Sequence, residues 1–191
     1  MTDTGVGGAS SAAEEPLRVR RATRDDAAHI ARVRVETWRA AYRGLIDTAV
    51  LDRLDMHREA TARAARWDEH HADPRTANLV AELRGEVVGW AAVGPTRDAA
   101  LPRYGELYAL YVLPAHWSRG VGHALIAVAE ERLRAAGFRR ALLWVLEVNE
   151  RAAAFYERHG WVEDGATLVD DRLVGGDAAH ALHERRRVTT L

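Results

Sequence analysis

The sequence predicts a single-domain α/β fold. Short apolar segments rich in β-branched and aromatic residues alternate with longer segments whose apolar residues recur at helical spacing. The 191 residues suffice for one domain with a sizeable core, and 48% apolar residues with charges of both signs is ordinary for a globular protein. Residues 1–16 are rich in Gly, Ser, Ala and Thr. They are expected to form a disordered tail, which leaves residues 17–191 as the domain.

The elements before the central strand follow from alternation, capping and turn signals. The predicted elements are a strand at 17–22, a helix from Thr23 to about Ala41, one or two helices within 47–67, and hairpin strands at 78–83 and 86–93. The later elements are a strand at 104–113, a helix from Gly122 to Gly137, a strand at 140–148, a helix at 149–159, a strand from Trp161, a turn at 175–177 and a strand near 181–189.

Composition excludes several classes of function. The formal net charge of −1 gives no electrostatic reason to expect binding to nucleic acid or to an anionic membrane. The chain contains no cysteine, so disulfides, thiolate metal sites and a cysteine nucleophile are excluded. No apolar stretch could span a bilayer and no signal-peptide pattern is present, so a cytoplasmic location is expected. His70, His71 and Asp73 resemble metal ligands only loosely, and no metal site is expected.

The most informative stretch is the strand that ends at Leu113, followed by a proline, a loop with two glycines and a helix. Side chains are absent at Gly120 and Gly122, so a ligand can approach the backbone closely. The amides at the helix start have no intrahelical acceptor and lie at the positive end of the helix dipole. The stretch therefore favours an anion, typically a phosphate, with Arg119 as an additional donor.

Three interpretations compete for these glycines. They could simply permit a strand–turn–helix junction. A dinucleotide fingerprint needs Gly or Ala three residues after its second glycine, where this chain has Leu125. A nucleotide P-loop needs a lysine, and all 27 basic side chains here are arginine. Two interpretations therefore stay open: a simple strand–turn–helix junction, and a pyrophosphate-binding loop of another type.

A second motif occupies the helix at 149–159. Asn149 is a suitable N-cap, and Gly160 is a suitable C-terminal stop. Ala152, Phe155 and Tyr156 share one helix face. On the residues alone, Tyr156 could be an amphipathic core residue whose hydroxyl is hydrogen-bonded locally.

Together the two motifs resemble the signatures of the GNAT superfamily of N-acetyltransferases. Arg119-Gly-Val-Gly122 opening a helix after a Leu-Tyr-Val strand is similar to its acyl-CoA signature, although Trp117 stands where the family has Gln or Arg. Asn149-x-x-Ala-x-x-Phe-Tyr-x-x-x-Gly-Trp161 is similar to the second signature. The resemblance covers nearly everything after the tail. It implies a mixed, mostly antiparallel sheet of about seven strands flanked by helices, with acyl-CoA in the splay between the strands at 104–113 and 140–148.

The resemblance also implies roles for the matching residues. The backbone of Leu110, Tyr111 and Val112 would pair with the pantetheine and the acyl carbonyl, with the Val112 amide as an oxyanion donor. Asn149 would contact the cofactor arm, and Tyr156 would protonate the departing sulfur. The implied pyrophosphate loop comprises Ser118, Arg119, Gly120, Val121, Gly122 and His123.

The base and the acceptor site are less constrained. Glu106 lies where histone-acetylating relatives place a base, and the alternative is a strand-end carboxylate facing solvent. Tyr108 would share its face in an unbulged strand. In this fold the first two helices wall the acceptor site, which implicates Trp38 and Tyr42, with core packing as the alternative for Trp38.

The implied activity is direct transfer of an acetyl group from acetyl-CoA, as co-substrate, to a primary amine, without an acyl-enzyme. The acceptor could be a small molecule or a protein or peptide amine. The alternative is a noncatalytic acyl-CoA-binding sensor module. No nucleic acid or membrane partner is expected. The sequence leaves the acceptor, the acyl chain length and the oligomeric state open, a homodimer included.

Overall fold

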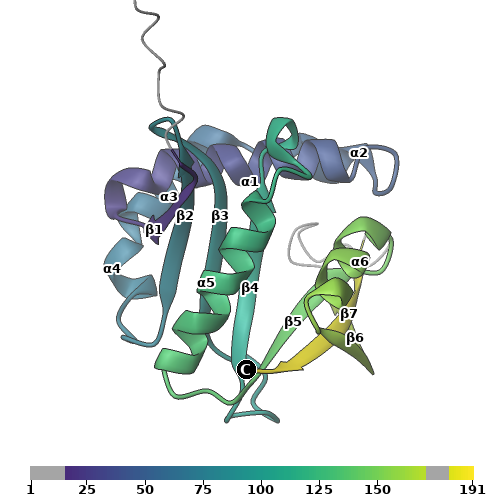
Figure 1. Ribbon diagram of the computed structural model, residues 1–191. Helices are drawn as coiled ribbons and strands as arrows, with labels where there is room; N and C mark the ends of the chain where they lie inside the picture. Colours follow the sequence, from purple (N-terminus) through teal and green to yellow (C-terminus); the bar gives the residue numbers. More distant parts are fainter. Residues whose placement is uncertain (1–15, 171–180) are drawn as a thin grey trace, which may run out of the picture.

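Seven strands form one mixed sheet in the order β1-β2-β3-β4-β5-β7-β6 (Figure 1). The computed structural model describes residues 16–170 and 181–191, so the predicted tail, apart from Pro16, and the predicted turn at 175–177 lie outside the described residues. Every neighbouring pair of strands is antiparallel except β4 and β5, which confirms the mixed, mostly antiparallel sheet. The strands are β1 (Arg18–Arg21), β2 (Ala77–Leu83), β3 (Glu86–Pro95), β4 (Gly105–Val112), β5 (Arg140–Leu146), β6 (Val162–Asp170) and β7 (Leu182–Thr190).

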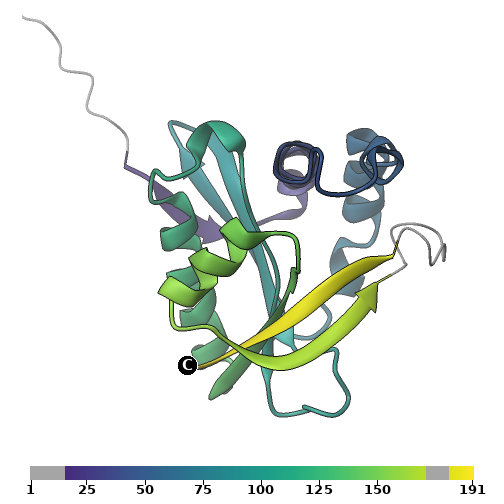
Figure 2. The same cartoon turned by 90° about the vertical axis from the view of Figure 1, so that its right-hand side faces the viewer.

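Helices cover both faces of this sheet, as Figures 1 and 2 show together. One face carries the N-terminal helices, and the other carries the helix that follows β4 and the helix that follows β5. The predicted region at 47–67 contains two helices and the start of a third. The helices are α1 (Ala27–Ala41), α2 (Thr48–Asp52), α3 (Met56–Ala65), α4 (Trp67–His70), α5 (Val121–Ala135) and α6 (Glu150–Arg158), with short 3-10 turns η1 (Arg24–Asp26) and η2 (Pro114–His116).

The two parallel strands separate along their length. β4 pairs with β5 only at Gly105↔Ala141 and Glu106↔Leu142, so the two strands splay apart towards their carboxyl ends. The predicted splay is therefore present. Because α5 follows β4 and α6 follows β5, the N-terminal ends of both helices lie at the open end of the gap.

A β-bulge interrupts β4 beside this gap. Ala92 of β3 pairs with Ala109, and Val93 pairs with Leu107, so Tyr108 is the extra residue. The expectation that Glu106 and Tyr108 share one face of an unbulged strand is therefore wrong. The two side chains nevertheless meet at Arg97, whose guanidinium bonds Glu106 and lies 4.8 Å from the centre of the Tyr108 ring.

Helix α5 packs on β3 through a close contact at Gly89. A methyl group built at Gly89 would lie 2.9 Å from Leu125 Cδ1 and 3.1 Å from Val121 Cγ1. Both of these side chains are fully buried. The missing side chain at Gly89 therefore sets the distance between the sheet and the helix whose first turn carries the glycine loop.

We expect Gly89→Ala to lower the free energy of unfolding by about 1–3 kcal/mol, because the added methyl forces α5 away from β3. Urea unfolding followed by tryptophan fluorescence measures the change. The same substitution in a Leu125→Val background should cost less, since the nearest clashing atom is gone. Equal costs in the two backgrounds would contradict this packing.

Candidate functional site

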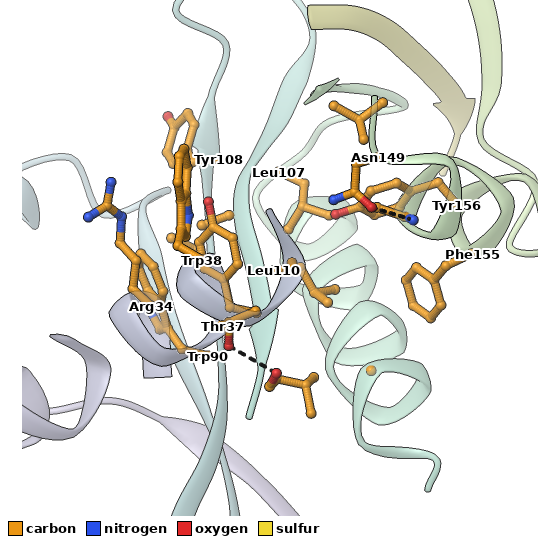
Figure 3. A pocket seen from close by; sticks show the side chains of 18 of the residues that line it. Arg34, Thr37, Trp38, Trp90, Leu107, Tyr108, Leu110, Asn149, Phe155 and Tyr156 are labelled. Carbon is orange, nitrogen blue, oxygen red and sulfur yellow. Dashed lines mark hydrogen bonds between the residues drawn. The ribbon is translucent and has the colours of Figure 1, made fainter. Parts of the chain in front are cut away.

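A cavity of about 920 Å³ occupies the gap between β4 and β5. Figure 3 shows its two walls. On one side lie Asn149 and Tyr156 of the α6 segment, and on the other lie Trp38 of α1 and Trp90 of β3, with Leu110 of β4 between them. The cavity thus connects both faces of the sheet through the splay.

Most of the residues that the sequence indicated meet at this cavity, although they come from four separate segments. Glu106, Arg119 and Val121 are not part of its lining. Arg119 is exposed and Val121 is buried against the sheet, so Val121 can contribute only its backbone. The predicted residues that line the cavity are Trp38, Tyr42, Leu110, Tyr111, Val112, Ser118, Gly120, Gly122, His123, Asn149 and Tyr156.

The glycine loop leaves a run of backbone amides free. The first α5 hydrogen bond runs from the Ala124 amide to the Gly120 carbonyl, at 3.0 Å. Within the described part of the chain, the amides from Ser118 to His123 have no protein acceptor. Ser118 and Gly120 both have positive φ, +59° and +83°, which turns the chain sharply into the helix. Such a cluster of amides at a helix start suits an anionic group.

Gly122 has a different role from Gly120. A methyl group built at Gly122 would lie 3.3 Å from Phe155 Cε2, whereas one at Gly120 would meet nothing within 4 Å. Gly122 therefore lets α6 approach α5, and Gly120 supplies the left-handed conformation. The contact between the helices is extended by His123 Nδ1, which lies 3.0 Å from His159 Nε2.

The carboxyl end of β4 is held from two sides. The Val112 carbonyl accepts hydrogen bonds from Thr37 Oγ1 at 2.9 Å and from Trp117 Nε1 at 2.6 Å. The Leu113 amide donates to Val88 on β3, so by alternation Leu110 and Val112 direct their backbone groups away from β3, into the gap. The same alternation turns the backbone of Tyr111 towards β3. This corrects the expectation that its backbone faces a ligand.

Trp117, which stands where the signature has Gln or Arg, packs against a positively charged side chain. The Arg151 guanidinium carbon lies 3.6 Å from the centre of the Trp117 ring, and both side chains line the cavity. Partial burial lowers the pKa of Arg151 from its usual value. A cation is thus present beside the loop although the signature's own polar residue is missing.

Asn149 and Tyr156 occupy fixed positions on the α6 side. Asn149 Oδ1 accepts from the Ala152 amide, and its Nδ2 donates to the Tyr42 hydroxyl, both at 3.0 Å. Burial raises the pKa of Tyr156 well above its usual value, with Tyr111 and Tyr42 adding to the effect. Within residues 16–170 and 181–191 the Tyr156 hydroxyl has no hydrogen-bond partner on the protein, so it is available to a ligand in the cavity.

Glu106 is buried, and the alternative of a solvent-facing carboxylate is wrong. Its side chain is 2% exposed. Arg97 Nε donates to Oε1 at 3.0 Å, and the Arg97 amide donates to Oε2 at 2.8 Å. The carboxylate stands behind the cavity wall, and its partner Arg97 lines the cavity. Glu106 therefore holds the loop that follows β3 in place through its bonds to Arg97.

Of the three loosely ligand-like residues, His70 lines the cavity and the other two are engaged elsewhere. His71 contacts the Trp67 carbonyl and Asn78, and Asp73 pairs with Arg75. In the described part of the chain, no three His, Asp or Glu side chains gather as a metal site would need. None of the helices described there is long and apolar enough to cross a membrane.

Sequence reasoning missed one part of the cavity. Arg34 and Arg63 line it beside Trp90. Arg34 stands one helical turn before Trp38, so helix periodicity could have indicated it. No local signal marks Arg63, because α3 reaches the cavity only through packing against α1.

Comparison with known proteins agrees with the geometry. Residues 30–161 match the family model described as the acetyltransferase (GNAT) family. The chain is 32% identical to the uncharacterised N-acetyltransferase YuaI of Bacillus subtilis over 160 residues, which are 82% of this chain and 88% of the relative.

Two solved structures share the fold. The PaiA N-acetyltransferase of Thermoplasma acidophilum, in complex with coenzyme A, gives a TM-score of 0.71 at 15% identity, over 93% of this chain and 100% of that one. YncA of Salmonella typhimurium, solved with acetyl-CoA, gives 0.69 at 21% identity, over 93% and 95%.

Replacing Arg97 and replacing Glu106 should lower the free energy of unfolding by different amounts, although both changes break the same contact. Arg97→Met leaves a buried carboxylate without its cation. Because the Arg97 side chain is itself 56% exposed and water can partly take its place, the variant should lower the free energy of unfolding by about 2–4 kcal/mol, more than Glu106→Gln. Glu106→Gln removes the charge itself and should cost about 1–3 kcal/mol. Urea unfolding of both variants checks the order. A smaller loss for Arg97→Met would contradict the burial of the carboxylate.

Proposed function

The chain belongs to the GNAT family of acetyltransferases, and on that premise we propose that it transfers an acetyl group from acetyl-CoA directly to a primary amine. The observation that carries this proposal is the set of free amides from Ser118 to His123, which opens onto a cavity reaching through the splay. The noncatalytic sensor alternative has no support, since the relatives are named N-acetyltransferases.

The cavity suits a CoA thioester on its α5 and α6 side. The free amides would bind the pyrophosphate, with Arg119 and Arg151 as nearby cations. The backbone of Leu110 and the amide of Val112, which β3 does not use, would pair with the pantetheine and the acyl carbonyl. The Asn149 side chain caps α6 and bonds Tyr42, and its second Nδ2 N–H would contact the cofactor arm.

Acetyl-CoA supplies a thioester whose C–S bond breaks as the amine nitrogen forms the new C–N bond, while the amine loses a proton and the sulfur gains one. The Val112 amide would donate to the carbonyl oxygen as negative charge develops there. Thr37 and Trp117 would keep this end of β4 in place through their bonds to the Val112 carbonyl.

Tyr156 would act as the hydrogen-bond donor to the departing sulfur. Its pKa is raised above 10 by burial, whereas a free thiol has a pKa of about 8.5. Complete proton transfer from the phenol to the thiolate is therefore uphill. A hydrogen bond still stabilises the developing thiolate, with the proton finally taken from solvent.

Glu106 would act as a positioning residue through Arg97, in place of the direct base role expected from the sequence. A base must reach the proton it removes, and this carboxylate is separated from the cavity by its own partner. The base role stays a prediction that the Glu106→Gln variant can test by its pH profile. A loss of turnover that shrinks at high pH would support a base, whereas a pH-independent loss supports positioning.

The function itself is tested by calorimetry with acetyl-CoA and by thiol release in the presence of a panel of primary amines. We expect acetyl-CoA to bind and at least one amine class to accelerate thiol release. Gly120→Val should weaken acetyl-CoA binding, because a β-branched residue disfavours the left-handed conformation that turns the amides inwards. Unchanged affinity in that variant, or no thiol release with any amine, would contradict the proposal.

Tyr156→Phe should lower turnover by roughly 10- to 1000-fold while leaving acetyl-CoA affinity nearly unchanged. The ring keeps its packing, so the melting temperature should change little. Tyr104→Phe is the matched control, since Tyr104 lies outside the cavity and bonds Arg140. Normal turnover in a stably folded Tyr156→Phe variant would reduce the hydroxyl to a structural role.

A further inference from the structure

The cavity wall opposite α6 carries a surplus positive charge. Glu59 of α3 bridges two arginines, with Arg34 Nη1 at 2.6 Å from Oε2 and Arg63 Nη2 at 3.0 Å from Oε1. All three side chains are less than one fifth exposed. One carboxylate neutralises only one of the two guanidinium groups, so this triad contributes a net charge of +1. Arg34 and Arg63 line the cavity, and Glu59 does not.

Aromatic rings hold the two guanidinium groups in place. The Arg63 carbon Cζ lies 4.5 Å from the centre of the Trp90 ring, and that of Arg34 lies 5.1 Å from the Trp38 ring. Trp90 in turn stacks on Tyr111 and donates to Asn78. The arginines are therefore preorganised, which reduces the entropy lost when they bind an anion.

The donors of this triad are not all used. Arg63 Nε is buried without a hydrogen-bond partner, and burial lowers the pKa of Arg63 despite the Glu59 pair. A buried guanidinium normally has its N–H groups matched by acceptors, because unpaired ones are costly. The wall thus carries two fixed guanidinium groups that share one carboxylate and line the cavity.

Negative side chains lie on the other side of the gap. Asp170 of β6 and Glu184 of β7 line the cavity, and the sheet order places both strands beyond β5. Burial is the largest cause of the raised pKa of Tyr111. Arg34 lowers this pKa and Glu184 raises it, so charged groups on both sides of the gap act on the Tyr111 hydroxyl. The splay, where an acyl thioester would lie, is therefore flanked by the two arginines on one side and, on the other, by two acidic side chains together with Arg151 and Arg158 of α6.

We propose that the acceptor is a small primary amine with a carboxylate close to its nitrogen, as in an α-amino acid, and that Arg34 and Arg63 bind this carboxylate. The inference rests on the proposed acetyltransferase function. Guanidinium donors match carboxylate oxygens. A polyamine brings only positive charge to the arginines, and a protein N-terminus has an amide where the free carboxylate is needed.

The test compares three matched acceptors in a steady-state thiol-release assay. For a panel of L-amino acids, each acid is assayed beside its primary amide and its decarboxylated amine. We expect kcat/KM to be at least about tenfold higher for the acids, the scale of one charge-assisted hydrogen bond. Against the amides, intrinsic reactivity points the other way, because the amine of an amino amide is less basic and more often neutral. The decarboxylated amine is more basic and less often neutral, so its kcat/KM is compared per neutral amine.

Arg63→Met should lower kcat/KM for the acids by about 10- to 100-fold, mainly through KM, and bring the three acceptors to similar values. Acetyl-CoA affinity by calorimetry should stay unchanged. Arg58→Met is the control, since Arg58 is an exposed residue of the same helix and lies outside the cavity. Arg34→Gln, at the other end of the triad, repeats the test if Arg63→Met folds poorly.

Two results would overturn the inference while leaving the function intact. One is acetylation of the amides or decarboxylated amines as fast as the acids. The other is a loss in the arginine variants that is equal for all three acceptors, which would indicate a structural role for the triad. If acetyl-CoA binds but no amine of any class is acetylated, the proposed function itself fails.

Discussion

The site depends on the early end of hydrogen bonding between β4 and β5. Parallel pairing stops after Glu106 and Leu142, and the strands then diverge. Beside the gap, Trp38 of α1 and Tyr42, which follows α1, pack with Leu146 of β5 in a cluster separate from the main core. A fully paired sheet would close the cavity and bury the edges from which its ligands are held.

An open strand edge leaves backbone groups that need partners. The protein satisfies the Val112 carbonyl with Thr37 and Trp117, from opposite sides of the sheet. The departure at Trp117 has a physical role here, because its indole N–H bonds the strand end while its ring face carries Arg151. The amides left over lie where a substrate can use them.

The two walls of the cavity differ in electrostatic character. The wall of α6 presents a neutral phenol, whose ionisation is suppressed by burial, and keeps its Arg151 cation beside the glycine loop. The wall of α1 and α3 presents fixed charge on arginines seated against aromatic rings. A neutral donor suits a leaving group that acquires charge only during the reaction, whereas fixed charge suits recognition of a permanently ionised group. This division gives leaving-group stabilisation and acceptor selection to separate sets of residues.

The sequence by itself determined those features that depend on residues close together in the chain. The turn at the glycines before α5, the Asn149 cap and the order of strands and helices follow from local backbone and hydrogen-bonding preferences, and the structure contains each of them. Only the tertiary structure decided the partner of Glu106, the bulge at Tyr108 and the Arg34–Glu59–Arg63 triad. These arise where a loop folds back, two strands shift register, or two helices pack. Their energies come from contacts that no local pattern encodes.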